Sequence, residues 1–157
     1  MAWYHSAPET SLVTVDSPRT QALIGFLRAQ KVSDGNLEVD VENKFCSIQL
    51  SSLDSKPISQ SLKMLLVAGG RVENTGQRWN SAETDVTNWG ESPTLIEPVV
   101  GTLVLKHLES AHSIQLQAID GSGQPIGPPV SATRAGGDWK IALGRTGTTW
   151  YELTVSR

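Results

Sequence analysis

Short stretches in which apolar and polar residues alternate are the feature that most restricts the fold of this chain. The segment NLEVDVE carries Leu37, Val39 and Val41 at alternate positions, with acidic residues between them. Because successive side chains of a strand point to opposite faces of a sheet, this pattern predicts a strand with one buried face. The same alternation recurs in three later segments, 113–120, 138–144 and 148–156.

These segments also predict which side chains enter the core. In segment 148–156, either Trp150 or the set that includes Tyr151 faces inward. Segment 101–108, GTLVLKHL, is apolar on both faces and predicts a central strand. Short runs rich in Gly, Pro, Asp and Asn separate the segments and predict turns. The expected core positions are Ile114, Leu116, Ala118, Trp139, Ile141 and Leu143, together with either Trp150 or the set Tyr151, Leu153 and Val155.

Strands of this length, with few helical periods between them, predict an all-β fold. We expect an antiparallel β-sandwich, jelly-roll-like, of about nine or ten strands with little helix. A chain of 157 residues fits a single domain, 1–157, in which 1–10 form an N-terminal extension that need not be wholly native. Segment 16–30 fits either a helix or a buried strand, and Gly25 favours the strand because glycine weakens a helix.

The composition excludes several classes of protein. One cysteine, Cys46, allows no intramolecular disulfide, and its alternation with Ile48 and Leu50 predicts a buried thiol and not a reactive one. The net charge of -3 and the lack of a basic run argue against a nucleic-acid partner. We also expect no membrane association, because no segment approaches the roughly 20 apolar residues of a membrane span.

Motifs that carry catalysis are missing from the sequence. It contains no Walker loop, no GxGxxG, no HExxH and no GxSxG motif. His107 and His112 lie five positions apart across an expected hairpin, where histidines are more often solvated than used as ligands. We therefore predict neither a catalytic residue nor a metal site from these histidines.

Acidic residues give two weaker candidates. The row Glu38, Asp40 and Glu42 could supply a glycosidase carboxylate pair, but three like charges on one face are better explained as a solvated strand edge. Structural calcium could bridge neighbouring loops, although no DxDxDG-like loop supports it and we predict no cofactor. The acidic residues available for such a calcium site are Asp34, Asp120 and Asp138.

The polar stretch 71–93 has the composition of a loop but holds two of the five tryptophans, Trp79 and Trp89. A flat indole can stack on the C–H face of a sugar ring, while amides, carboxylates and arginine bond its hydroxyls. These residue types predict a carbohydrate-binding loop, or else two indoles that pack as the loop's own small core. The polar residues of the predicted site are Arg78, Asn80, Glu83, Asp85 and Asn88.

The remaining aromatic residues predict other roles. Trp139 and Trp150 are expected in the core or in the wall of a groove, since each lies in a predicted strand. Trp3 and Tyr4 lie near the N-terminus and could close over the edge of a sheet.

Three blocks of sequence, in this order and spacing, carry a family resemblance: VTVDSPRTQALIGF, SSLDSKPISQSLKMLLVAGGRVENTGQRWN and NWGESPTLIEPVVGTLVL. Together they resemble a β-rich C-terminal domain that follows the catalytic domain in some large multi-domain bacterial glycoside hydrolases. The resemblance covers roughly residues 10–155. It implies a non-catalytic domain that either binds carbohydrate or packs on the catalytic barrel, and it assigns no ligand-contacting residue.

We therefore expect a non-catalytic carbohydrate-binding module that targets an appended glycoside hydrolase to a plant-type polysaccharide of the β-glucan or hemicellulose class. Its partners would be that polysaccharide and a catalytic glycosidase domain in the same parent chain, which a bacterium would secrete. Two alternatives stay open. One is a structural accessory domain whose tryptophan loop docks on the catalytic domain, and the other is a small jelly-roll glycoside hydrolase.

Overall fold

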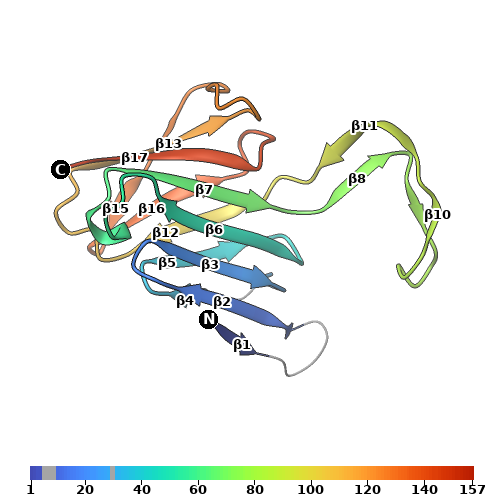
Figure 1. Cartoon of the computed structure of the whole chain (residues 1–157), viewed down its shortest axis with the longest axis horizontal. Helices are drawn as coiled ribbons and strands as arrows, with labels where there is room; N and C mark the ends of the chain where they lie inside the picture. Colours follow the sequence, from blue (N-terminus) through green and yellow to red (C-terminus); the bar gives the residue numbers. More distant parts are fainter. Residues whose placement is uncertain (5–9, 29–30) are drawn as a thin grey trace.

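A computed structural model of the chain describes residues 1–4, 10–28 and 31–157, and of residues 2–4 it describes the backbone alone. Two antiparallel sheets pack face to face and form a sandwich (Figure 1). The larger sheet has the strand order β1-β2-β3-β6-β7-β17-β13-β14. Its strands are β1 (Ala2–Tyr4), β2 (Leu12–Asp16), β3 (Thr20–Gly25), β6 (Cys46–Ser52), β7 (Lys63–Gly69), β17 (Trp150–Ser156), β13 (Ser113–Ile119) and β14 (Val130–Ser131).

The smaller sheet has the order β15-β16-β12-β5-β4, and a 3₁₀ turn, η2 (Ile58–Gln60), precedes β7. The prediction of an all-β antiparallel sandwich with little helix is confirmed. Two- and three-residue strands at the sheet edges raise the strand number above the expected nine or ten. The strands of this sheet are β15 (Thr133–Ala135), β16 (Asp138–Leu143), β12 (Gly101–Leu105), β5 (Leu37–Val41) and β4 (Val32–Asp34).

The core lies between the two sheets and follows the alternation in the sequence. Segment 101–108 supplies β12, which is central as expected, and segment 16–30 supplies strand β3. The side chains expected inside are buried, and Trp150 takes the outward position at 41% exposed. Fully or nearly fully buried are Leu37, Val39, Val41, Cys46, Ile48, Leu50, Ile114, Leu116, Ala118, Trp139, Ile141, Leu143, Tyr151, Leu153 and Val155.

The expected N-terminal extension, 1–10, includes β1, which continues the larger sheet by pairing with β2. Residues 5–9 lie outside the described residues, and so do the side chains of Trp3 and Tyr4. Among the residues that the structure describes, no helix has the length and apolar character that a membrane crossing requires.

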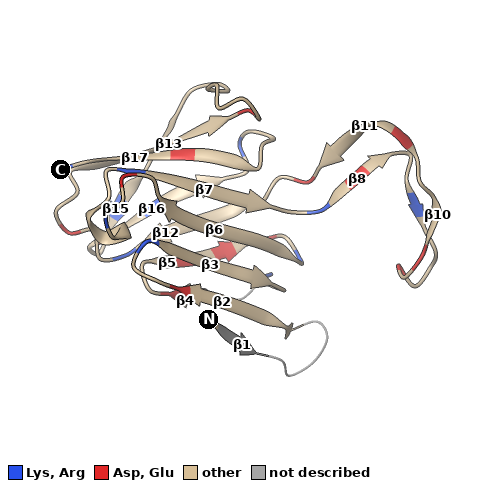
Figure 2. Cartoon of the chain, viewed as in Figure 1, with Lys and Arg blue, Asp and Glu red and all other residues tan. Residues whose placement is uncertain are grey.

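Residues 71–97, called the arm below, project from one end of the sandwich (Figure 1). The stretch expected as a loop is a β-ribbon in two sections, in which β8 (Val72–Thr75) pairs with β11 (Glu91–Ile96) and β9 (Arg78–Trp79) pairs with β10 (Val86–Asn88). All residues of the arm are described, and none of their side chains is buried. Acidic and basic residues both lie along it (Figure 2).

Glycines fix the base of the arm. A Cβ atom on Gly70 would lie 2.5 Å from the carbonyl oxygen of Glu97, so the two ends of the arm approach each other closely at Gly70. The strand before it, β7, buries Met64, Leu66 and Ala68 at alternate positions.

Candidate functional site

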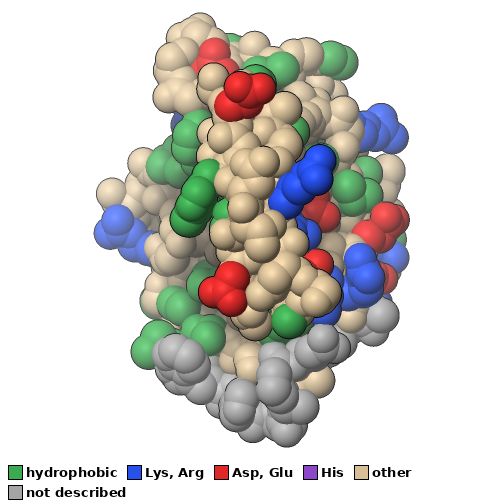
Figure 3. Space-filling view, turned by 90° about the vertical axis from the view of Figure 1, so that its right-hand side faces the viewer, with side chains coloured by type: hydrophobic (Ala, Val, Ile, Leu, Met, Phe, Trp, Pro, Cys, Tyr) green, Lys and Arg blue, Asp and Glu red, His purple; other side chains and the backbone are tan. Residues whose placement is uncertain are grey.

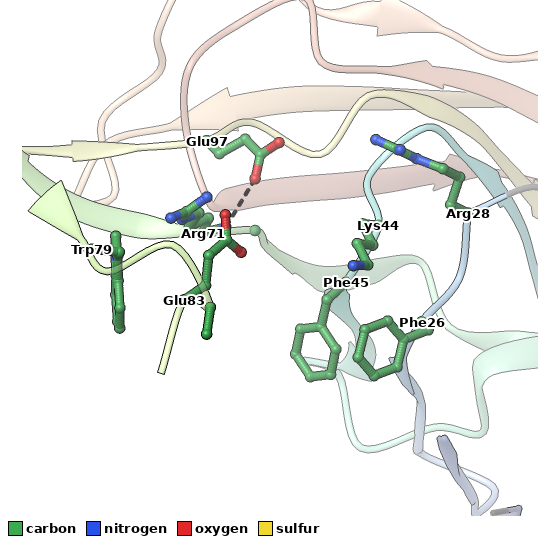
Figure 4. Close-up of a pocket in the computed structure, with 10 residues that line it drawn as sticks. Phe26, Arg28, Lys44, Phe45, Arg71, Trp79, Glu83 and Glu97 are labelled. Atoms are coloured by element: carbon green, nitrogen blue, oxygen red, sulfur yellow. Dashed lines mark hydrogen bonds between the residues drawn. The ribbon is translucent and has the colours of Figure 1, made fainter. Parts of the chain in front are cut away.

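A cleft of about 680 Å³ lies between the base of the arm and one end of the sandwich (Figure 4). Two loops of the sandwich form one wall, and the arm forms the other. The cleft therefore joins segments that are far apart in the sequence. Its lining residues are Phe26, Arg28, Lys44, Phe45, Gly70, Arg71, Trp79, Ala82, Glu83 and Glu97.

The arm's wall is built around Trp79, which is 37% exposed. Its indole nitrogen donates a 2.6 Å hydrogen bond to Oε1 of Glu73. The same carboxylate oxygen lies 2.5 Å from Nη2 of Arg71, whose guanidinium carbon is 5.9 Å from the centroid of the Trp79 ring. Glu73 therefore holds both the indole and the guanidinium in fixed orientations.

Phe26 and Phe45 form the facing wall of the cleft (Figure 4). Their ring centroids are 5.2 Å apart and their planes cross at 76°, an edge-to-face arrangement that aromatic pairs favour. The register of β3 and β6 pairs Gly25 with Cys46, which sets the two phenylalanines opposite each other just beyond that pair. Sequence reasoning missed them because only the pairing of the two strands brings them together.

Gly25 is required where this wall begins. Its φ is +149°, and a Cβ atom there would lie 2.2 Å from the carbonyl oxygen of Ser11. The backbone nitrogen of Phe26 then donates a 3.1 Å hydrogen bond to that same oxygen. Only glycine permits this approach, so the position of Phe26 depends on it.

Charged groups surround the aromatic walls. Arg71 donates its backbone N–H to Oε2 of Glu97 at 3.3 Å, and Nε of Arg28 donates to the carbonyl oxygen of Glu42 at 2.6 Å. Glu83 is exposed in the turn after β9, with a φ of +54°, and points into the cleft (Figure 4). The cleft thus combines aromatic surfaces with carboxylate acceptors and guanidinium donors.

The predicted site residues are only partly brought together. Trp79 and Glu83 line the cleft. Asn80 and Asp85 instead close the turn of the arm, where the Asn80 amide donates to Thr84 Oγ1 at 2.9 Å and to Asp85 Oδ2 at 3.2 Å. Thr84 returns a backbone N–H to Oδ1 of Asn80 at 2.9 Å. These two polar side chains therefore shape the arm.

Trp89 is 71% exposed and does not line the cleft. Its carbonyl oxygen accepts a 3.0 Å hydrogen bond from the side-chain amide of Asn74. Asn88 and Arg78 pair across β9 and β10, and Oδ1 of Asn88 accepts the backbone N–H of Gly90 at 2.9 Å. The two tryptophans therefore do not form one platform, and Trp79 is the one that faces the sandwich.

The acidic row Glu38, Asp40 and Glu42, on and just after β5, lies in two environments. Glu38 lies 2.6 Å from Nζ of Lys106 and 3.4 Å from Nζ of Lys31, and the hydrogen bond from Lys106 lowers its pKa despite an opposing effect of burial. Asp40 and Glu42 are exposed. A structural ion pair therefore accounts for Glu38.

The residues considered for a metal site, the histidines and the acidic residues of the loops, make contacts of other kinds. Nδ1 of His107 lies 3.8 Å from Glu109. The Asp120 carboxylate accepts hydrogen bonds from Ser122 and from the backbone of Gln124, which lower its pKa and close a turn. Across residues 1–4, 10–28 and 31–157, no three His, Cys, Asp or Glu side chains, those of Asp34, Asp138 and His112 included, gather into a group that could hold a metal ion.

A scan against protein-family models finds no match to this chain, and searches among curated proteins and solved structures find none either.

Proposed function

We propose that this chain is a non-catalytic carbohydrate-binding module that holds a plant-type polysaccharide, of the β-glucan or hemicellulose class, in the cleft beside the arm. One observation carries the proposal. The Trp79 indole and the Phe26–Phe45 pair face each other across a cleft whose rim bears carboxylates and arginines (Figure 4). Carbohydrate presents the complementary surfaces, because its rings have apolar C–H faces and its edges carry hydroxyl groups.

The chemistry of the cleft fits one sugar ring against Trp79. The hydrogen bond to Glu73 fixes the indole before a ligand arrives, so little side-chain entropy remains to be lost on binding. Glu83 and Glu97 can accept hydrogen bonds from hydroxyls, and the guanidinium of Arg71 can donate them. A volume of about 680 Å³ lies within the range of roughly 300–1,000 Å³ for small-molecule sites.

Affinity electrophoresis against soluble β-glucan, xylan, mannan, xyloglucan and pectin tests the proposal. We expect retardation by a β-glucan or a hemicellulose, and loss of retardation in Trp79→Ala. Trp150→Ala is the matched control, because it removes an indole of similar exposure, 41%, from outside the cleft. Retardation that survives Trp79→Ala would refute the site. Release of reducing sugar by the purified chain would instead favour the hydrolase alternative.

A second candidate function, docking on a catalytic domain, rests on the apolar surface of the arm. Val72 is 56% exposed, Leu95 54% and Ile96 39%. Val72 pairs with Ile96, so these two side chains share one face of the ribbon, and Leu95 lies on the other face. Figure 3 views the molecule from the side of the arm, where hydrophobic side chains reach the surface. A two-stranded ribbon is marginal in water by itself, and exposed apolar surface often marks an interface.

Amide hydrogen exchange separates the two candidates. If the arm docks, amides of β8 and β11 should exchange much more slowly in the parent polypeptide than in this chain alone. Equal exchange in both would remove the docking candidate.

The carbohydrate proposal includes export as part of a larger bacterial enzyme. A module that binds plant polysaccharide must meet its ligand outside the cell.

A further inference from the structure

A second hollow adjoins the cleft at Arg28, which lies on the side of the cleft opposite Trp79 (Figure 4). It has a volume of about 570 Å³ and is called the trough below. Arg28 lines both the cleft and the trough, so the two spaces meet at its side chain. The trough is lined by Arg28, Asp40, Val41, Glu42, Gly101 and Thr102.

The strand register explains which residues come together in the trough. Asp40 on β5 pairs with Thr102 on β12, so their side chains lie on the same face of the smaller sheet. The short edge strand β4 pairs with β5 only from Leu37 to Val39, and beyond it the backbone of Arg28 bridges to Val41 in place of a strand. A Cβ atom on Gly101 would lie 2.3 Å from the Asp40 carbonyl oxygen, so close packing of the two strands leaves no side chain there.

Arg28 is held at the junction of the two spaces. Its Nε donates a 2.6 Å hydrogen bond to the carbonyl oxygen of Glu42, and its backbone forms a parallel bridge with Val41. One nitrogen of the guanidinium is thereby anchored to the edge of the smaller sheet. Arg28 therefore lies where a ligand would pass from the cleft to the trough.

We propose that the cleft and the trough form one continuous groove, which binds an internal stretch of a neutral polysaccharide chain several sugars long. The inference rests on the proposed function and specifies its ligand. Each of the two spaces falls within the range of roughly 300–1,000 Å³ that small ligands occupy, so the pair holds more than a single sugar. The trough adds polar contacts to the aromatic contacts of the cleft.

The charged side chains of the groove favour a neutral polysaccharide over an acidic one. Four carboxylates line it against three basic side chains, those of Arg28, Lys44 and Arg71. The two arginines are partly engaged, since Arg71 is paired with Glu73 and Arg28 with a backbone carbonyl. A polyuronate would bring one negative charge per sugar towards these carboxylates, and juxtaposed like charges oppose binding. The four carboxylates belong to Asp40, Glu42, Glu83 and Glu97.

Isothermal titration with length series of cello-, xylo- and manno-oligosaccharides tests the groove. We expect the affinity in at least one series to rise about tenfold or more from the disaccharide to the hexasaccharide. Asp40→Ala and Thr102→Ala each remove polar contacts and should weaken hexasaccharide binding by about three- to tenfold. Polygalacturonate should bind more weakly than the neutral chains.

The outcomes separate a failure of the groove proposal from a failure of the proposed function. If the wild-type chain binds no member of any series, the proposed function fails. Trp79→Ala should abolish binding at every length, and if it does not, the cleft is not the binding site. If Trp79→Ala abolishes binding but disaccharide and hexasaccharide bind equally well, the function stands and the groove is wrong. Insensitivity of hexasaccharide binding to both trough variants also overturns the groove, and tighter binding of polygalacturonate overturns the neutral ligand. Circular dichroism of each variant checks that it is folded.

Discussion

The indole nitrogen of Trp79 is anchored on Glu73, 2.6 Å from Oε1, and the same carboxylate holds Arg71 beside the ring. The cleft therefore depends on a carboxylate that does not line it. This arrangement gives Glu73 a positioning role that can be measured separately from the role of the indole.

Glu73→Ala should weaken glycan binding by about three- to tenfold, because the indole and Arg71 lose a shared hydrogen-bonding partner. Glu91→Ala provides the control, since it removes an exposed carboxylate from β11 outside the cleft. Affinity electrophoresis on the glycan retained by the wild-type chain measures both. Equal loss in the two variants would indicate a general charge effect and contradict the positioning role.

The same leucine substitution should have very different effects in the sandwich and in the arm. Leu103 is fully buried on the central strand β12, so Leu103→Ala should lower the free energy of unfolding by about 2–5 kcal/mol. Leu95 is 54% exposed, and Leu95→Ala should change it by less than about 0.5 kcal/mol. Urea denaturation gives both values. A large effect of Leu95→Ala would mean that the arm is packed in solution.

Alternation in the sequence predicted the sandwich because burial of one strand face imposes a period of two on the residues that form it. The side chain of Tyr151 is buried and that of Trp150 is exposed, for example, although either could have faced inward from sequence alone. The arm escaped prediction for the same physical reason. It buries no face, so its strands carry no alternation, and its composition is that of a loop.

The candidate site was predictable only in part. Trp79 and Glu83 were identified because aromatic and carboxylate residues are what sugars bind. Asn80 and Asp85 belong to the same residue types but are used within the arm's turn, which only the hydrogen-bond geometry shows. Phe26 meets the site through the pairing of β3 with β6, a contact between distant segments that no local pattern encodes.

The thiol of Cys46 should be inert in the folded chain. Burial, with a smaller contribution from the negative charge of Glu97, raises its pKa to about 11, and its side chain is fully buried. Since the thiolate is the reactive form, an aromatic disulfide reagent at pH 8 should modify the native protein far more slowly than the protein in denaturant. Equally fast modification in both states would contradict the burial.

Asp54 should make the fold more stable at neutral than at acidic pH. Its carboxylate accepts hydrogen bonds from the hydroxyls of Ser52 and Ser61 and from the backbone N–H of Leu62, at 2.8–2.9 Å. The bond from Leu62 is the largest cause that holds the pKa of Asp54 well below its ordinary value. The folded state therefore binds this proton less readily than the unfolded state, in which the pKa is about 3.9.

The stabilisation from Asp54 is complete above the unfolded pKa and is lost as the pH falls towards the lower folded pKa. Asp54→Asn should accordingly be less stable than wild type at pH 7, and the difference should shrink as the pH falls below about 4. Thermal unfolding of the two proteins across that range measures it. A difference that grows in acid would reverse the sign and refute the assignment.

Removal of the arm should leave the sandwich folded. Gly70 and Glu97 approach so closely that a Cβ atom on Gly70 would lie 2.5 Å from the Glu97 carbonyl oxygen, so a short Gly-Ser linker can replace residues 71–96. The returning chain is fixed independently by Asn43, whose amide donates to the Pro98 carbonyl oxygen at 3.1 Å and accepts from the backbone of Val100 at 2.8 Å.

The shortened chain should keep the circular dichroism of a β-sandwich and a cooperative thermal transition, because the arm contributes no buried side chain to the core. It should also lose glycan binding, since Trp79 and Glu83 leave with the arm. Wild-type chain and Trp79→Ala, measured in parallel, separate the loss of one indole from the loss of the wall. If the shortened chain fails to fold, the arm is an integral part of the sandwich, and if it folds and still binds glycan, the binding surface lies on the sheets.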